Sequence, residues 1–151
     1  MTENRYAVYP CTPEMLGDIV TVERQSFSCP WSAESLRLTA EREDSIFLTV
    51  CRGENAVAFG CILLAENEGE LVDIAVAPEH RQKGLGQLLL AALLAEAQNR
   101  GAEQIFLEVR ESNKAARGLY EKNGFVPIGR RKKYYKNPVE DAVVMQLLCS
   151  Q

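Results

Sequence analysis

Two segments of this chain carry residue types that could perform group-transfer chemistry. The first, Val72–Gly86, is an apolar run that ends at a proline and passes into a basic loop with glycines. The second, Leu107–Phe125, contains an acid, Glu108, among alternating apolar residues and a phenol, Tyr120, further along. A strand leading into a loop suited to phosphate, followed by an acid and a phenol, favours an acyltransferase over a simple binding protein.

The loop in the first segment has the pattern Arg81-x-x-Gly84-x-Gly86. Its glycines let the backbone turn tightly and approach a ligand closely. A helix predicted over Gln87–Arg100 follows, and its first amides have no partner within the helix, so they can bind a pyrophosphate. The candidate amides are those of Gln82, Lys83, Gly84, Leu85, Gly86 and Gln87. Spacing alone is equally consistent with a plain strand–helix turn. The loop has neither the Walker nor the dinucleotide-binding pattern.

The acid and the phenol of the second segment each have two interpretations. Glu108 lies within a strand predicted over Gln104–Val109, where a buried carboxylate is costly unless it is paired or used. It could act in catalysis or form a structural ion pair with Arg110. Tyr120 lies in a helix predicted over Asn113–Lys122, where it could be catalytic or pack against a sheet.

The remaining signals predict the order β-α-α-β-β-β-α-β-α-β-β. This is an α/β chain with a mixed, twisted sheet and helices on both faces, because early hairpins give antiparallel strands and a crossover helix gives parallel ones. The predicted strands are Tyr6–Pro10, Ile46–Arg52, Ala56–Leu64, Leu71–Val76, Gln104–Val109, Phe125–Tyr135 and Asp141–Leu148. The first two helices begin after Thr12 and Ser32, which are suited to N-capping. Ligands enter such sheets where neighbouring strands part.

Composition excludes several other classes of protein. The 151 residues suit one domain over 1–151, and the net charge of −4 argues against a general nucleic-acid binder. Five cysteines without a Cys-x-x-Cys pair and a single histidine, His80, argue against a disulfide framework or a metal site. We read His80 as facing solvent. The chain lacks a signal-peptide pattern and a run long enough to span a membrane, so we expect a cytoplasmic monomer or weak dimer.

The loop that follows Asp73-Ile-Ala-Val-Ala-Pro78 resembles the acetyl-coenzyme A site of the GNAT acetyltransferase superfamily. Further segments resemble one branch of it, the bacterial ribosomal-protein-alanine N-acetyltransferases (RimI-like), which acetylate a protein's N-terminal amine. These segments are Phe27-x-x-Pro-Trp-Ser32, Glu108-Val-Arg-x-Ser-Asn113, Leu119-Tyr-Glu-x-x-Gly-Phe125 and Tyr134-Tyr135…Glu140-Asp-Ala. The resemblance extends from the first helix to the last strand, and Asp73 and Arg117 depart from the residues common in relatives.

The resemblance implies a fold and a cofactor site. It implies the GNAT fold, with acetyl-coenzyme A as cosubstrate and no metal. The backbone of Ile74, Ala75 and Val76 would pair with the pantetheine arm, and the loop 82–87 would hold the pyrophosphate. Asn113 would form a hydrogen bond with the cofactor.

The resemblance also implies a mechanism by direct attack in a ternary complex. Glu108 would accept a proton from the attacking amine, and Tyr120 would donate one to the departing thiolate. At pH 7 an α-amine is about a tenth neutral and a lysine only about one part in a few thousand, which favours a protein N-terminus as acceptor. We expect the N-terminal alanine of a small-subunit ribosomal protein. A small-molecule amine or a lysine side chain stays open as an alternative.

Two further interpretations concern surface segments. Cys29-Pro-Trp-Ser32 and Tyr134-Tyr135 could form the walls of a peptide groove, or Trp31 could serve only to anchor a helix. Arg130-Arg-Lys-Lys-Tyr-Tyr135 combines basic and aromatic groups and could instead bind RNA. RNA affinity that collapses with salt, without acetyl-coenzyme A binding, would favour that second class.

Overall fold

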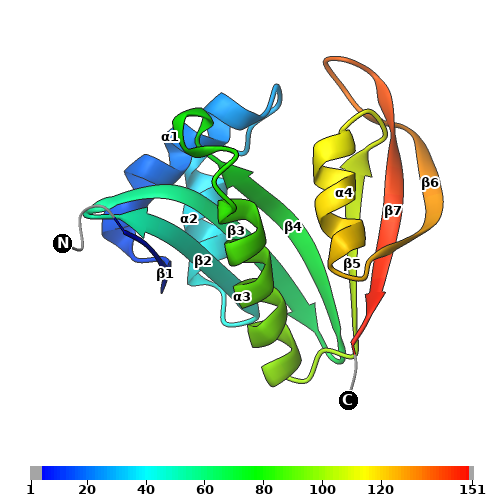
Figure 1. The fold of residues 1–151 in the computed structure, drawn as a ribbon, viewed down its shortest axis with the longest axis horizontal. Helices are drawn as coiled ribbons and strands as arrows, with labels where there is room; N and C mark the ends of the chain where they lie inside the picture. Colours follow the sequence, from blue (N-terminus) through cyan, green and yellow to red (C-terminus); the bar gives the residue numbers. More distant parts are fainter. Residues whose placement is uncertain (1–4, 150–151) are drawn as a thin grey trace.

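The computed structural model describes residues 5–149 and contains a seven-stranded sheet in the order β1-β2-β3-β4-β5-β7-β6. The strands are β1 (Tyr6–Pro10), β2 (Ser45–Arg52), β3 (Asn55–Ala65), β4 (Glu68–Val76), β5 (Gln104–Arg110), β6 (Val126–Tyr135) and β7 (Glu140–Leu148). The helices are α1 (Leu16–Ser26), α2 (Ala33–Glu41), α3 (Leu85–Asn99) and α4 (Lys114–Lys122), with short 3-10 turns at Pro13–Met15 and Pro78–His80. The predicted element order and the mixed sheet are confirmed (Figure 1).

Helices cover both faces of the sheet and enclose two apolar layers. On one face, α3 and α4 pack through fully buried residues such as Leu89, Leu93 and Ile105. On the other, α1 and α2 pack through Ile19, Leu36 and the strand residue Phe59. Each fully buried side chain of this size stabilises the fold by about 1.5–3 kcal/mol relative to exposure, so these layers hold the strands that carry the site.

The helix ends differ in detail from the sequence prediction. Ser32 caps α2 as predicted, because its Oγ accepts a hydrogen bond from the Ser35 amide at 3.0 Å. Thr12 makes no side-chain cap and precedes a 3-10 turn. Helix α3 begins at Leu85 rather than Gln87, and Gly84 adopts the left-handed conformation at its N-cap, with φ +79°. The glycine allows the chain to enter the helix at an angle that other residues adopt only with strain.

The sheet divides between β4 and β5. These parallel strands pair only over Glu68–Glu70 and Gln104–Phe106, after which each continues beside its other neighbour. Strand β4 stays paired with β3 as far as Val76, and β5 stays paired with β7 as far as Arg110. Figure 1 shows the two strands meeting near the C-terminus and diverging toward the other end of the sheet. Main-chain groups on the parted edges are therefore free to meet a ligand.

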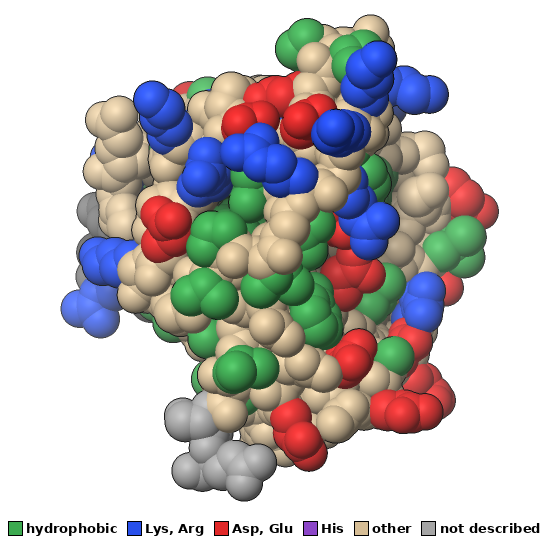
Figure 2. All heavy atoms as spheres, turned by 90° about the vertical axis from the view of Figure 1, so that its right-hand side faces the viewer, with side chains coloured by type: hydrophobic (Ala, Val, Ile, Leu, Met, Phe, Trp, Pro, Cys, Tyr) green, Lys and Arg blue, Asp and Glu red, His purple; other side chains and the backbone are tan. Residues whose placement is uncertain are grey.

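Strand β6 forms the far edge of the sheet and pairs only with β7. Nearly all of its residues are exposed, including Val126 and Ile128. Figure 2 shows this side of the molecule, where basic side chains gather toward one end close to acidic ones and hydrophobic side chains lie exposed beside them. Within residues 5–149, no helix is long and apolar enough to cross a membrane.

Candidate active site

A cleft of about 800 Å³ lies where β4 and β5 part. Its walls come from α1, the loop after α1, β4, β5, α4 and the turn between β6 and β7. The sequence-predicted site residues that line it are Ile74, Ala75, Val76, Gly86, Glu108, Asn113 and Tyr120. Residues from two distant segments of the chain therefore meet in one cleft, as the sequence interpretation requires.

The predicted pyrophosphate loop lies at the start of α3, next to the cleft. Gln82, Lys83 and Gly84 are exposed, and the first amide bonded within the helix is that of Leu88, which donates to the Gly84 carbonyl at 3.1 Å. The amides of Leu85, Gly86 and Gln87 therefore have no partner within the helix. The side chains of two of these residues serve the fold. Leu85 is buried in the core, and the Gln87 amide group bonds to Asn123 at 3.0 and 2.8 Å.

Only alternate residues of β4 present their main-chain groups to the cleft. The Ala77 amide donates to the Val57 carbonyl at 2.8 Å, so this residue faces β3. Because hydrogen-bonded and non-bonded pairs alternate along an antiparallel ladder, Ala75 also faces β3, whereas Ile74 and Val76 present their main-chain groups to the cleft. The Val76 carbonyl already accepts a hydrogen bond from Arg81 Nε at 2.9 Å. A strand-like ligand would thus find its partners at Ile74 and the Val76 amide rather than at Ala75.

Asn113 serves the fold as well as the cleft. Its Oδ1 accepts a hydrogen bond from the Ala116 amide at 3.1 Å and so caps α4. The side chain is exposed at the cleft wall. Its NH₂ group remains the donor that could reach a ligand.

Glu108 is held by a cation from the edge strand. Its Oε2 accepts a hydrogen bond from Arg131 Nε at 3.0 Å, with its side chain 15% exposed and that of Arg131 59%. The ion pair with Arg110 that the sequence left open does not form, because Arg110 pairs with Glu140 at 3.2 Å. Burial and the charge of Glu108 raise the pKa of neighbouring Glu70. Glu108 therefore lies at the half-buried wall of the cleft, between the cation of Arg131 and the nearby acid Glu70.

Tyr120 combines the two roles that the sequence left open. Only 6% of it is exposed, and its ring packs edge-on against Phe125 with the centroids 5.8 Å apart. It also lines the cleft. Burial raises the pKa of its hydroxyl, with smaller contributions from Tyr135 and Asp73. The phenol therefore stays protonated at neutral pH and can donate a proton or a hydrogen bond.

From the sequence, Arg110 is only a possible ion-pair partner for Glu108. In the structure it holds the turn between β6 and β7 at the cleft. Its guanidinium donates to the carbonyls of Lys136 at 2.7 Å and Pro138 at 3.0 Å. It also lies over the Tyr135 ring, 4.6 Å from the centroid. These contacts hold the predicted aromatic wall, Tyr134 and Tyr135, at the cleft.

A second acidic pair, Glu23 and Asp73, lies in the same cleft and was not predicted as a site. Both residues are buried, at 1% and 8% exposure. Glu23 Oε2 accepts a hydrogen bond from the Trp31 amide at 2.9 Å, so the loop after α1 is attached to this acid. In the sequence, this pair is indicated only by the position of Glu23 on the apolar face of the helix predicted after Thr12. His80, predicted to face solvent, is half-buried and bonds to the Tyr6 hydroxyl at 2.9 Å.

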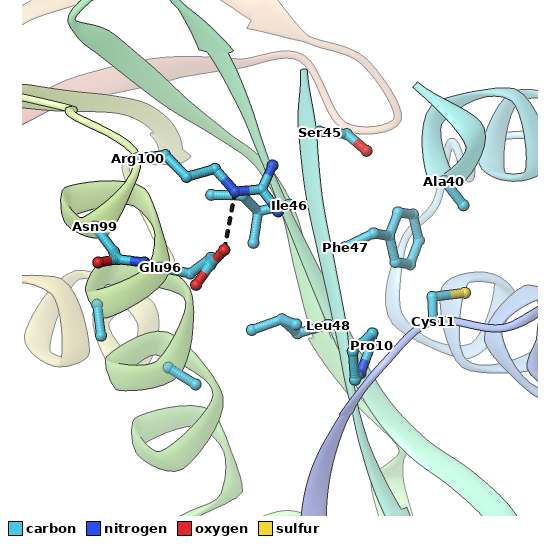
Figure 3. Close-up of a pocket in the computed structure, with 12 residues that line it drawn as sticks. Pro10, Cys11, Ala40, Ser45, Ile46, Phe47, Leu48, Glu96, Asn99 and Arg100 are labelled. Carbon is cyan, nitrogen blue, oxygen red and sulfur yellow. Dashed lines mark hydrogen bonds and ion pairs between the residues drawn. The ribbon is translucent and has the colours of Figure 1, made fainter. Parts of the chain in front are cut away.

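A second hollow, of about 790 Å³, lies at the edge of β2 near the end of β1. Figure 3 shows that its lining residues lie on both sides of the strand. Glu96 of α3 and Arg100, directly after α3, pair with each other on one side, and Phe47, Ala40 and Cys11 lie on the other. None of the predicted site residues lines it. In the part of the chain described, no group of three or more His, Cys, Asp or Glu side chains is placed to hold a metal ion.

The fold and cleft agree with comparisons to known proteins. Residues 16–125 match the model of the Acetyltransferase (GNAT) family, so the chain belongs to this family and is an acetyltransferase. The chain is 36% identical over 127 residues to the [ribosomal protein bS18]-alanine N-acetyltransferase of Haemophilus influenzae, covering 82% of this chain and 86% of that protein.

Two solved structures bear on the fold. The crystal structure of the ribosomal-protein-S18-alanine N-acetyltransferase from Escherichia coli matches with a TM-score of 0.90 and 30% identity, over 97% of this chain and 96% of that one. An N-acetyltransferase from Thermoplasma acidophilum in complex with coenzyme A matches with a TM-score of 0.73 and 20% identity, over 96% and 99% of the two chains. The predicted GNAT fold is confirmed.

Proposed function

We propose that this enzyme transfers the acetyl group of acetyl-coenzyme A to the N-terminal α-amine of a protein, by direct attack in a ternary complex. The observation that carries the chemistry is the parting of β4 and β5, which brings Glu108 and Tyr120 into one cleft. The acceptor that we propose is the N-terminal alanine of a small-subunit ribosomal protein. This choice rests on the relatives, which are named for that reaction on protein bS18.

The residues present fit acetyl-coenzyme A. The free amides at the start of α3 suit a pyrophosphate, and Lys83 adds positive charge in the same exposed loop. The cleft-facing groups of Ile74 and Val76 suit the amides of a pantetheine arm. The NH₂ group of Asn113 lies on the opposite wall. When bound there, acetyl-coenzyme A supplies the thioester carbonyl that the acceptor amine attacks.

In the mechanism that we propose, Glu108 accepts the proton that the acceptor amine loses, directly or through a water molecule. Arg131 fixes the orientation of this carboxylate through the 3.0 Å hydrogen bond. The amide of Val76 points into the cleft and stabilises the negative charge that develops on the carbonyl oxygen. Tyr120, kept protonated by burial, donates its proton or a hydrogen bond to the departing sulfur. The protein itself needs no nucleophile.

The shape of the acceptor side supports a peptide. Trp31 and the aromatic pair Tyr134 and Tyr135 line the cleft on the side of the loop after α1. Asn137 Nδ2 lies 3.5 Å from Cys29 Sγ, so this loop meets the turn between β6 and β7. The two segments together form a groove wall that a peptide could contact along its length. A small-molecule amine would contact little of this wall.

The RNA-binding alternative receives no support from the basic run in β6. Arg130 pairs with Glu111 at 2.6 Å, and Arg131 pairs with Glu108. Figure 2 shows acidic side chains close to the basic ones on this side of the molecule. Half of the four charges in the run are thus neutralised within the protein, which weakens its attraction for phosphates.

The proposal is tested by intact-mass measurement of peptides incubated with the enzyme and acetyl-coenzyme A. The panel contains a peptide with a free N-terminal alanine and an internal lysine, the same peptide with its α-amine blocked, and a polyamine. We expect a single acetyl group on the first peptide and none on the second. Acetylation of the blocked peptide or the polyamine at a comparable rate would overturn the assignment of an N-terminal acceptor.

A further inference from the structure

The buried acids Glu23 and Asp73 form a carboxyl pair that the proposed chemistry leaves unused. Glu23 belongs to α1 and Asp73 to β4, and the two face each other across the layer that joins α1 to the sheet. Glu23 Oε1 and Asp73 Oδ2 are fully buried, and neither has a hydrogen-bond partner unless a proton lies between the two carboxyl groups. Unsatisfied buried oxygens are rare in folded proteins and call for a physical explanation.

One shared proton explains part of this arrangement. Burial, followed by the hydrogen bond and charge of Glu23, raises the pKa of Asp73 to about 9. Asp73 therefore holds a proton at neutral pH, and this proton can lie between the two carboxyl groups. Two acids joined by a proton could fasten α1 to β4, but an apolar pair would do so without a buried charge.

Neither carboxyl group has a cation within ion-pair distance in the described part of the chain, although Lys136 lines the same cleft. The arginines that line the cleft are engaged elsewhere. Arg81 donates to the Val76 carbonyl and to Ser26 Oγ, and Arg110 holds the turn between β6 and β7. A buried charge without a partner is costly, so a cation from outside the protein would be favoured here.

We propose that Glu23 and Asp73 form the subsite that binds the acceptor's N-terminal ammonium group before transfer. Both acids line the cleft on the side of Trp31, where the proposed peptide groove begins. At pH 7 an α-amine is mostly protonated and offers three N–H donors to the available oxygen lone pairs. This inference rests on the proposed function, and it assigns Glu23 and Asp73 to binding while Glu108 keeps the role of proton acceptor.

Amide substitutions separate the charge of the pair from its shape. In Glu23→Gln and in Asp73→Asn, one carboxylate remains and the new amide can donate across the pair. In the double variant Glu23→Gln/Asp73→Asn the hydrogen bond between the side chains can persist while the charge is gone. The control Glu43→Gln/Glu54→Gln removes two exposed acids outside the cleft.

The experiment measures dissociation constants by calorimetry at pH 7 with enzyme saturated with coenzyme A, which cannot react. The probes are an alanine-initiated peptide and the same peptide with lactic acid in place of alanine, so that a neutral hydroxyl replaces the ammonium. We expect the parent and the control to prefer the alanine peptide by about tenfold, as for a hydrogen bond to a charged group. The preference should be largely retained in the single variants, which keep one carboxylate, and absent in the double variant.

The outcomes distinguish this subsite from a structural role and from the proposed function. A folded double variant with the parental preference would overturn the subsite, and so would an equal loss of affinity for both peptides. Because binding is measured without turnover, a parent that fails to acetylate any peptide refutes the proposed function alone. Melting temperature and coenzyme A affinity establish that each variant is folded.

Discussion

Arg131 Nε lies 3.0 Å from Glu108 Oε2, and this hydrogen bond joins the exposed edge strand β6 to the carboxylate in the cleft. The guanidinium is 59% exposed and the carboxylate 15%, so the cation can move while the acid stays in place. The acid proposed to accept the amine's proton is therefore oriented by a residue from a different hairpin. Its orientation depends on a contact that can be removed without disturbing the core.

Replacing Arg131 with Gln should lower kcat/KM by about two- to fivefold, because the carboxylate of Glu108 loses the hydrogen bond that fixes its orientation. An effect of this size corresponds to the roughly 0–1 kcal/mol that exposed ion pairs contribute. Arg130→Gln is the matched control, because Arg130 pairs with Glu111, directly after β5, and not with Glu108. Initial rates with the alanine-initiated peptide that match those of the parent would contradict the proposed role of Arg131.

Replacing Glu108 with Gln should lower kcat by about 100-fold or more, since positioned general bases contribute about 10²–10⁴ in rate. The amide keeps the size of the side chain, so the melting temperature and the affinity for coenzyme A should stay close to those of the parent. Initial rates with the alanine-initiated peptide measure the effect, with Glu111→Gln as the control. Near-parental turnover would remove Glu108 from the mechanism.

Replacing Tyr120 with Phe should lower kcat by roughly 10- to 100-fold through loss of the proton donor. The ring that packs against Phe125 is retained, so the core stays filled. Because the departing thiolate is the group that needs the proton, thioester analogues with a more acidic thiol should lose less activity. An equal loss for all leaving groups would argue against proton donation.

Replacing Gly84 with Ala should weaken coenzyme A binding about tenfold. A Cβ at this position meets no atom within 4 Å, but the backbone φ is +79°. Holding a non-glycine residue there costs about 1–2 kcal/mol, so the loop is expected to relax and the free amides to lose their alignment. Gly118→Ala in the exposed part of α4 is the control, and it should stabilise that helix by up to about 1 kcal/mol. Calorimetry measures the dissociation constant of coenzyme A for each variant. A Gly84→Ala variant with the parental affinity would contradict the role of this loop in binding the pyrophosphate.

The stability of the protein should fall as pH rises toward 9, and Asp73→Asn should lessen this fall. The pKa of Asp73 is about 9 in the folded protein, against 3.8 for the free side chain, so the folded state binds a proton that the unfolded state lacks between these values. The free energy of unfolding therefore decreases with pH across that window.

Melting temperatures at pH 6 and pH 9 measure the effect on stability. The difference between the two should be smaller in Asp73→Asn than in the parent by several degrees, a shift of about the size expected for 1 kcal/mol in a domain of this length. Asp44→Asn is the control, because the Arg42 hydrogen bond lowers the pKa of Asp44 below 3.8, so this carboxyl group does not titrate between pH 6 and pH 9. Identical pH dependence in the parent and Asp73→Asn would show that this carboxyl group does not hold the proton.

Several parts of the site could be predicted because they depend on local sequence. The glycines of the loop, the cap at Ser32 and the helix that ends before Gly101 are set by neighbours within a few residues, and the structure contains each of them. Glu108 and Tyr120 could be named as candidates from their residue types, but their roles as proton acceptor and proton donor came from the resemblance to the GNAT family. Helix α3 begins at Leu85, two residues before the predicted start at Gln87, because the local sequence does not indicate that Leu85 is buried.

Other parts depend on contacts between segments that are far apart in the chain. The partner of Glu108 could have been Arg110 by proximity in sequence, but alternation along β5 and pairing with β7 and β6 bring Arg131 to it instead. The meeting of Glu23 with Asp73 requires α1 to pack on β4, and no local pattern specifies which acid faces which.

The sequence by itself determined the elements, the phosphate-ready loop and the candidate acid and phenol, since hydrophobic period, glycine positions and capping act over short distances. Only the tertiary structure decided where β4 and β5 part, which arginine orients Glu108 and that two buried carboxyl groups share one cleft. Those relationships arise from strand pairing and packing between distant segments, where burial and charge, rather than residue spacing, select the partners.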